Sequence, residues 1–331
     1  MKPENETETE KIKTEKPIAT EKRTMTELSV SVKVTEDCVD GIPCVIVENA
    51  SPYSLSQTLE CGQCFRFDKV ANSEYQSEYT GVAMGKFIHI AQRADSSLVF
   101  FNIDKEEFFS TWFRYFSLDI GLEEIKNDIL RNAPCGNLLY SAAECAKGIA
   151  ILRQDAWEAL FSFIVSQNNN IPRIRKIIRT ICEAYGNRIE NVHDLSGEAV
   201  YSFPSAEQIA AEPEKMDSAH VGFRLRYLTD AAVRVASGTI NLSDVASMGD
   251  YDKAKQSLMQ ITGVGSKVAD CTLLFGMNYL CAFPVDVWIK RSMPKYFDDN
   301  FTPASLGRYA GIAQQYIFYY SRLTEGEKTK K

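Results

Sequence analysis

The sequence predicts an α+β protein in which a β-rich, antiparallel N-terminal domain precedes an all-helical body. Two observations carry this prediction. From about Leu28 to Phe101, short β-rich runs alternate with turn residues. From about Glu106 onward, the apolar residues instead recur at helical spacing. With 331 residues and 45% hydrophobic content, the chain is long enough for two or three subdomains that each have a core.

Both ends of the chain are polar. The first 27 residues are rich in Glu, Lys and Thr, and such a segment cannot bury enough surface to offset its ordering entropy. We therefore expect disordered tails at 1–27 and 324–331. Between them we expect an α+β domain over 28–135 and a helical domain over 136–323. No apolar run approaches the length that crosses a bilayer, which predicts a soluble protein.

Individual strands and helices follow from local patterns. The runs 44–47 and 86–90 are typical of strands and predict an antiparallel sheet. Two apolar stripes predict helices whose apolar face is core rather than site. The first stripe comprises Trp157, Leu160, Phe161 and Ile164, and the second comprises Ile174, Ile177, Ile178 and Ile181.

A glycine-containing turn lies within a helical hairpin predicted at about 258–276. Gly263 and Gly265 flank one apolar residue, which allows a tight turn with positive φ. Apolar residues after the turn repeat at helical spacing, so the turn opens a helix. The unpaired backbone N–H groups at such a helix start can hold a phosphate without any contact to a base.

Lys267 falls in the first turn of this predicted helix. The positive end of the helix disfavours an ammonium group, and partial burial would lower the pKa of the lysine further, leaving a neutral amine nucleophile. Taken alone, these residues also fit a purely structural turn with a solvated lysine.

Asp286 lies nineteen positions after Lys267, in the segment Pro284-Val285-Asp286-Val287-Trp288. It precedes a short helical stretch from Val287 to Met293, so it fits a helix N-cap. Capping could be its whole role. Alternatively, a carboxylate near an amine can stabilise cationic charge that develops on a sugar.

Together these residues resemble the helix-hairpin-helix (HhH-GPD) DNA glycosylase superfamily, whose hairpin ends in a catalytic lysine and whose catalytic aspartate follows in a Pro-Val-Asp-Val segment. Within it, the chain is similar to 8-oxoguanine DNA glycosylases from about Leu28 to Arg322. Four further segments carry this similarity: Gly62-Gln63-Cys64-Phe65-Arg66, Asn168-Asn169-Asn170-Ile171-Pro172-Arg173, Gly222-Phe223-Arg224-Leu225-Arg226-Tyr227 and Ala310-Gly311-Ile312-Ala313-Gln314. The resemblance implies a TBP-like N-terminal domain and DNA bound in a cleft between helical subdomains.

The resemblance implies a bifunctional base-excision repair enzyme, glycosylase and AP lyase together. Its partner would be double-stranded DNA carrying 8-oxoguanine, or formamidopyrimidine-guanine, opposite cytosine. A base inside a duplex must first be flipped into a pocket. Lys267 would then attack the sugar C1′ and form a Schiff base while Asp286 stabilises the cationic sugar, and β-elimination would nick the strand.

The resemblance also implies the residues that hold the flipped base. The Gly62 carbonyl would accept from N7–H, which distinguishes 8-oxoguanine from guanine. Gln314 would contact the Watson–Crick edge, and Phe318 and Cys271 would cover the two faces of the base. Cys271 lies four residues after Lys267, hence on the same helix face.

Recognition of the opposite cytosine would fall to Asn168, Arg173 and Arg224, because arginine offers forked donors to the acceptors of that base. Phe223 would wedge into the stack, and Asn170 would lie near the lesion strand. Many family members have His where this chain has Trp288, which can contact a phosphate only through its single N–H. The Trp form is more similar to bacterial members, so we expect a cytoplasmic protein, or a nuclear one if the source is eukaryotic.

The net charge of −7 does not suit a DNA-binding protein unless positive groups gather locally. One cluster stands out, since Arg173, Lys176 and Arg179 share a predicted helix face with Arg175 adjacent. A solvated helix face is the other interpretation of this cluster.

Nine cysteines without a signal peptide indicate free thiols in a reducing compartment. Cys61 and Cys64 have the spacing of metal ligands, but no second pair follows, so we expect no metal site. The last cysteine is Cys281, which precedes Asp286, so we also expect no iron–sulfur cluster and no cofactor. We expect a monomer.

Three alternatives stay open. The first is a related glycosylase that acts on another oxidised base. The second is a non-catalytic helix-hairpin-helix DNA-binding module, in which Lys267 only contacts phosphate; such a module does not require Asp286. The third is a Schiff-base lysine enzyme for small carbonyl compounds, for which the chain lacks barrel-like alternation of strands and helices.

Overall fold

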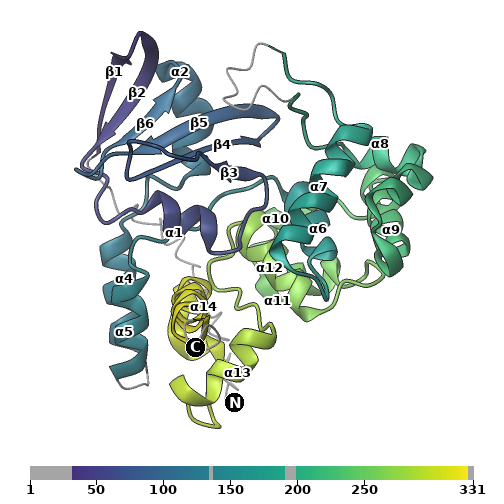
Figure 1. The fold of residues 1–331 in the computed structure, drawn as a ribbon. Coiled ribbons are helices and arrows are strands. Elements are labelled where there is room, and N and C mark those ends of the chain that lie inside the picture. The colour runs from purple at the N-terminus through teal and green to yellow at the C-terminus, as the bar shows by residue number, and fades with distance from the viewer. Residues whose placement is uncertain (1–31, 134–136, 191–198, 327–331) are drawn as a thin grey trace, which may run out of the picture.

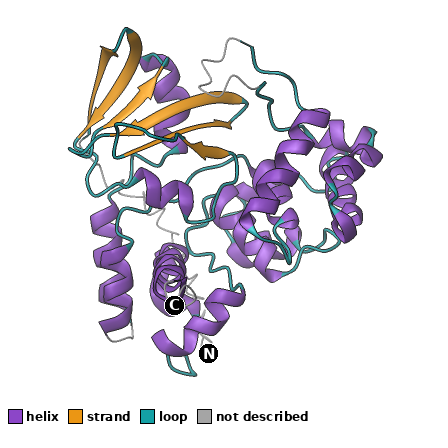
Figure 2. Ribbon diagram, in the orientation of Figure 1, coloured by secondary structure: helices purple, strands orange, loops and turns teal. Residues whose placement is uncertain are grey.

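The computed structural model describes residues 32–133, 137–190 and 199–326. All strands gather at one end of the molecule (Figure 2). Below and beside them lie two groups of helices, α4, α5, α13 and α14 in one and α6 to α12 in the other (Figure 1). This arrangement confirms the predicted α+β class. The expected tail at 1–27 and the expected domain boundary at residue 135 lie outside the described residues.

Six strands form one antiparallel sheet in the order β1-β2-β6-β5-β4-β3. The strands are β1 (Lys33–Val39), β2 (Ile42–Glu48), β3 (Phe67–Lys69), β4 (Ser77–Ala83), β5 (Lys86–Gln92) and β6 (Leu98–Phe101). Both predicted strand runs lie in this sheet, in β2 and β5. Successive side chains of a strand face opposite sides, so Val45 and Val47 pack with Trp112 in one core while Cys44 and Ile46 join a smaller cluster.

Helices make up most of the rest of the chain. Beside the sheet lie α1 (Leu55–Glu60), α2 (Lys105–Glu107), the π-helical turn η1 (Phe108–Trp112) and α3 (Phe113–Tyr115). The two helical groups contain α4 (Leu122–Asn132), α5 (Asn137–Cys145), α6 (Ala156–Val165), α7 (Ile171–Tyr185), α8 (Ala206–Ala211), η2 (Pro213–Ala219), η3 (Gly222–Arg224), α9 (Leu225–Ala236), α10 (Leu242–Ser247), α11 (Tyr251–Leu258), α12 (Ser266–Gly276), α13 (Val287–Tyr296), η4 (Pro303–Tyr309) and α14 (Ala310–Gly326). Among the described helices, none is long and apolar enough to cross a membrane.

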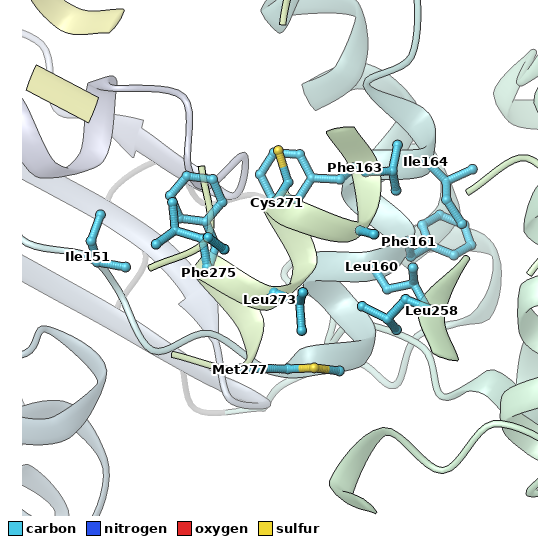
Figure 3. Packing of buried hydrophobic residues seen from close by; sticks show 14 of the residues in the cluster. Ile151, Leu160, Phe161, Phe163, Ile164, Leu258, Cys271, Leu273, Phe275 and Met277 are labelled. Carbon is cyan, nitrogen blue, oxygen red and sulfur yellow. The ribbon is translucent and has the colours of Figure 1, made fainter. Parts of the chain in front are cut away.

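The larger core joins the helical groups. The two predicted apolar stripes lie buried in it, on α6 and α7. Figure 3 shows α6 and α12 packed through Leu160, Phe163, Leu273 and Phe275. We expected the helical domain to begin at residue 136 and to end at residue 323. α4, which lies before residue 136, packs in the larger core through Ile125 and Ile129, and α14 continues past residue 323.

Candidate active site

The predicted hairpin is present as α11, a tight turn and α12. Gly263 in the turn has φ +81, and a Cβ added there would lie 2.3 Å from Tyr227 Cγ, so only glycine fits. Gly265 differs from the expectation, because its φ of −93 and ψ of −178 are extended values that any residue adopts. The reversal of the chain is made by Gly263 alone, and Gly265 serves instead as the N-cap of α12.

Gly265 leaves the start of α12 uncovered. No side chain caps this helix end, and a Cβ at Gly265 would meet nothing within 4 Å. The first N–H groups of a helix have no intrahelical partners and lie at the positive end of its dipole. The turn therefore presents an open anion site of the kind that a DNA phosphate can occupy.

Asp270 fixes the two hairpin helices to each other. Its buried carboxylate accepts from Tyr251 Oη at 2.7 Å, from Lys255 Nζ at 2.9 Å and from Ser266 Oγ at 3.3 Å. Burial raises the pKa of Asp270, and the hydrogen bonds from Lys255 and Tyr251 oppose that rise. Because two of these donors belong to α11 and the acceptor to α12, the network holds the first turn of α12 in place.

Lys267 is half-buried in that first turn. Its Nζ donates to Ser166 Oγ at 3.1 Å and lies 5.0 Å from the centre of the Phe163 ring. Ser166 Oγ in turn donates to the Phe163 carbonyl at 2.7 Å, so it acts as an acceptor for the lysine. Sequence reasoning missed both contacts. Ser166 lies two residues before Asn168, where the motif similar to 8-oxoguanine DNA glycosylases begins, and this proximity was a usable signal. Phe163 belongs to the apolar pattern of α6 and gave no such signal.

Asp286 caps α13, as predicted. Its Oδ1 accepts from Ile289 N at 2.8 Å, and the helix runs further than expected, to Tyr296. The charges of both Lys267 and Asp286 act on the Cys271 thiol. Burial raises the pKa of Cys271 to about 11, Lys267 lowers it, and Asp286 is among the groups that raise it. Lys267 and Cys271 thus lie one helical turn apart on α12, and Asp286 is near enough for its charge to act on the Cys271 thiol, which stays neutral.

Gly62 and Phe318 are distant in sequence but lie close together in the structure. A Cβ on Gly62, whose φ is +85, would lie 3.6 Å from Phe318 Cε1. Gln314 lies one helical turn before Phe318 on α14 and is buried. α14 can approach the segment that follows α12 because Gly311 has no side chain; a Cβ there would lie 2.6 Å from Leu274 Cδ1 and 3.0 Å from Leu280 O, and the Gly311 N–H donates to Leu280 O at 2.8 Å.

Gln63 holds the Gly62 loop. This fully buried side chain donates through Nε2 to Thr58 O and Ala150 O, each at 2.8 Å, and its Oε1 accepts from Leu152 N at 2.9 Å. Both N–H donors and the oxygen of this amide are therefore hydrogen-bonded within the protein. Gln63 therefore fixes the position of Gly62 relative to the segment that leads into α6.

Of the predicted opposite-base residues, Asn168 and Arg173 are exposed and Arg224 is buried. Asn168 is exposed with φ 47, and Asn170 caps α7 by accepting from Arg173 N at 3.0 Å. Arg224 is only 2% exposed, and its Nε donates to Gln167 O at 2.9 Å while Nη2 donates to Asn168 O at 2.9 Å. In this state the guanidinium of Arg224 is used to hold the loop and is not open to a base.

Phe223 precedes Arg224 and is 51% exposed. The Arg224 guanidinium carbon lies 4.5 Å from the centre of the Phe223 ring, and Phe223 also makes an edge contact with Tyr227 at 6.0 Å between centroids. An exposed aromatic ring held on two sides is suited to insertion between bases. Trp288, in the first turn of α13, is also exposed, at 36%.

The predicted basic face of α7 is divided. Arg175 and Arg179 both pair with Asp68 of the N-terminal part, at 2.9 Å and 3.0 Å. Arg173 and Lys176 remain exposed. Two of the four cations thus pair with an acidic residue that is distant in sequence, while Arg173 and Lys176 are the members of the cluster that make no ion pair with Asp68.

A cavity of about 600 Å³ lies between β3, β4 and α7, lined by residues that include Arg66, Asp68, Arg175 and Tyr201. Neither Lys267 nor Asp286 lines it. Arg66 in this wall pairs with the buried Glu158 at 3.5 Å. The cavity is thus a feature of the contact between the sheet and the helical body, separate from the lysine.

Comparisons with known proteins agree with this geometry. Residues 45–160 match the family model described as 8-oxoguanine DNA glycosylase, N-terminal domain. The N-glycosylase/DNA lyase of Saccharomyces cerevisiae is 30% identical over 263 residues, which cover 73% of this chain and 68% of the relative. The chain belongs to the 8-oxoguanine DNA glycosylase family. This glycosylase is an N-glycosylase/DNA lyase, as the resemblance of its motifs predicted.

Other members show the same relationship to the glycosylase. The N-glycosylase/DNA lyase OGG1 of Arabidopsis thaliana is 26% identical, with 80% of this chain and 76% of the relative covered. The solved structure of Clostridium acetobutylicum 8-oxoguanine glycosylase/lyase, in complex with dsDNA containing cytosine opposite to 8-oxoG, matches with a TM-score of 0.77 and 34% identity. That match covers 88% of this chain and 98% of the relative.

Proposed function

We propose that this glycosylase excises 8-oxoguanine, and formamidopyrimidine-guanine, opposite cytosine in duplex DNA and then cleaves the strand. The observation that carries the proposal is the convergence of Lys267, Cys271 and Asp286 beside an open helix N-terminus. The Clostridium relative, crystallised with dsDNA containing cytosine opposite to 8-oxoG, supports the choice of lesion and opposite base. A DNA substrate places the enzyme with the chromosome, in the cytoplasm of a bacterium or the nucleus of a eukaryote.

Lys267 supplies the nucleophile. Attack of Nζ on C1′ forms a C–N bond as the bond from C1′ to the base breaks, and the departing base keeps that electron pair and takes up a proton. Ring opening of the sugar gives an imine on Lys267. Loss of a C2′ proton then expels the 3′ phosphate together with its bonding electrons, which cuts the strand.

Asp286 acts through its charge. Its cap to Ile289 holds the carboxylate in one orientation. A fixed negative group beside the sugar stabilises the positive charge that develops at C1′, without reorganisation at the moment of reaction. Ser166 and Phe163 hold the lysine from the other side, which keeps Nζ in place for attack.

In this proposal the flipped base lies beside Gly62 and Phe318, which lie close together in the free protein. The Gly62 carbonyl accepts from N7–H, Phe318 stacks on one face, and the neutral Cys271 thiol covers the other. Gln314 contacts the Watson–Crick edge. In this proposal Phe223 fills the space that the base leaves, while Trp288 and the N–H groups after Gly265 hold the backbone.

Asn168, Arg173 and Arg224 recognise the opposite cytosine, with Asn170 on the lesion strand. For Arg224 this requires an exchange, because its donors are bonded to the carbonyls of Gln167 and Asn168 in the free protein. We infer that DNA binding releases this guanidinium and offers it the acceptors of cytosine instead.

Borohydride trapping tests the proposal. The wild type and Lys267→Gln are each incubated with a duplex that contains one 8-oxoguanine opposite cytosine, and with a matched guanine duplex. We expect a covalent complex only with the wild type and the lesion. Circular dichroism and duplex binding show whether the variant is folded. A folded wild type that binds the lesion duplex but neither traps nor releases base contradicts the proposed substrate.

A further inference from the structure

Gln315 on α14 has no role in the chemistry above, yet it is bonded to a residue that does. Its Nε2 donates to Gln314 Oε1 at 2.7 Å, and both side chains are buried, at 4% and 3% exposure. Neighbouring helical residues point about 100° apart, so a hydrogen bond between their side chains requires a specific pair of conformations. We propose that Gln315 fixes the orientation of the Gln314 amide and thereby selects bases with a guanine-type Watson–Crick edge.

A packing role alone does not explain this residue. Gln315 Oε1 is buried without a hydrogen-bond partner. An unpaired buried oxygen is unfavourable, and an apolar side chain of the same length would fill the space without that cost. What an apolar side chain could not supply is the donor to Gln314. The observation therefore points to the hydrogen bond as the reason for an amide at this position.

The bond leaves one end of Gln314 for the ligand. Among the described residues, the buried side-chain atoms without a partner include Gln315 Oε1 but not Gln314 Nε2, and no hydrogen bond from Gln314 Nε2 occurs. This nitrogen therefore keeps some contact with solvent. Phe318, one turn later on the same helix face, lies against Gly62, so this face of α14 is the one assigned to the flipped base in the proposed function.

An amide can pair with the edge of a base in two orientations, because one end of the amide donates hydrogen bonds and the other accepts them. Guanine and 8-oxoguanine present an acceptor, O6, beside a donor, N1–H. Adenine and 8-oxoadenine present the reverse, N6–H₂ beside N1. Rotating the Gln314 amide by 180° would exchange these preferences. While Gln315 donates through Nε2, only Gln314 Oε1 can accept, and this pairing holds the orientation that gives NH₂ to O6 and leaves an oxygen lone pair for N1–H. Gln315 acts through Gln314 and is a positioning residue.

This inference rests on the proposed function, and a matched pair of substrates tests it. 8-Oxoadenine and 8-oxoguanine share their N7–H and C8 carbonyl and differ at the Watson–Crick edge. Single-turnover excision of each, opposite cytosine, is measured for the wild type, Gln315→Met and Gln315→Glu. Met removes the donor at similar length, and we expect the ratio of 8-oxoguanine to 8-oxoadenine excision to fall about tenfold. Glu offers only acceptors when ionised, favours the rotated amide, and should lower the ratio further.

Two controls separate specificity from structure. Strand cleavage at a preformed abasic site involves no base, so we expect Gln315→Met to leave it unchanged. In a Gln314→Ala background, adding Gln315→Met should have no further effect on the ratio. Equal losses of activity of Gln315→Met on 8-oxoguanine, 8-oxoadenine and abasic DNA would overturn the inference. An unchanged ratio of 8-oxoguanine to 8-oxoadenine excision in Gln315→Met would also overturn it, provided that the wild type excises 8-oxoguanine. A wild type that leaves 8-oxoguanine in place contradicts the proposed function itself.

Discussion

The turn before Lys267, at the start of α12, and the loop that contains Gln167 and Asn168 lie on neighbouring elements but use their polar groups in opposite ways. In the turn, the N–H groups that follow Gly265 have no side-chain cap. In the loop, the donors of Arg224 are bonded to the carbonyls of Gln167 and Asn168. One region leaves its donors for a ligand, and the other uses its donors to hold its own backbone.

In the proposed function, this difference separates catalysis from recognition. Neighbouring groups such as Asp270 and Ser166 hold the turn in place before DNA arrives, so the donors and the lysine need little reorganisation. The loop must exchange internal hydrogen bonds for bonds to cytosine, which makes its response dependent on the opposite base. A mispaired duplex would thus bind near the same turn but leave Arg224 in its internal position.

The largest effect that we expect comes from Asp286→Asn. Asparagine caps a helix as well as aspartate does, so the cap to Ile289 and the stability of the fold should persist. The negative charge is lost, and single-turnover excision should fall by about 10² to 10³-fold. Single-turnover assays on the lesion duplex measure the excision rate, and urea unfolding measures the free energy of unfolding. A variant with unchanged rate would reduce Asp286 to a capping residue.

The two glycines of the turn provide the next test, because the structure gives them different roles. Gly263→Ala places a Cβ against the Tyr227 ring at a φ of +81, and should destabilise the fold by about 2 to 4 kcal/mol. Gly265→Ala has open space and should leave unfolding by urea nearly unchanged. Its added methyl group instead narrows the approach to the helix start, so duplex affinity should fall. Equal unfolding free energies for the two variants would show that Gly263 and Gly265 do not have the different roles assigned to them.

The arginines of the recognition region form a second matched pair. Arg224→Met leaves the carbonyls of Gln167 and Asn168 without donors, and should lower the unfolding free energy by about 1 to 3 kcal/mol. Arg173→Met removes an exposed side chain and should change it by less than about 0.5 kcal/mol. Both should lower the preference for cytosine opposite the lesion, measured as excision rates from four duplexes. If Arg224→Met has the same unfolding free energy as the wild type, Arg224 does not hold the loop through the carbonyls of Gln167 and Asn168.

Sequence patterns predicted the fold because its signals are local, and the residues proposed to react were also chosen from local motifs. The alternation of strands, the helical stripes and the spacing around Lys267 each depend on neighbouring residues. The pairing of Asp68 with Arg175 and Arg179, and the burial of Arg224, depend on contacts between distant segments. Local spacing carries no information on such contacts. The positive φ of Gly263 was predicted, but the extended Gly265 was not, since glycine permits both conformations.

A modest effect that depends on pH should come from Asp230, which ties α9 to the turn before Lys267. Its Oδ2 accepts from Thr262 N at 2.7 Å and from Arg234 Nε at 2.8 Å. Although burial alone would raise the pKa of Asp230, the hydrogen bonds from Thr262 and Arg234 outweigh it and bring the pKa below the usual 3.8. A carboxylate with a depressed folded pKa stabilises the protein above its unfolded pKa and loses that contribution as the pH falls.

Asp230→Asn removes this titration but keeps an oxygen that can accept from Thr262. We expect the variant to be less stable than the wild type by about 1 kcal/mol near neutral pH, because the bonds to a charged acceptor are lost. The difference should shrink as the pH falls below about 4, since the wild-type carboxylate then takes up a proton. Urea unfolding of both proteins at a series of pH values measures it. A difference that stays constant with pH would show that the charge of Asp230 does not hold the turn, and that the geometry of the Thr262 bond alone is sufficient.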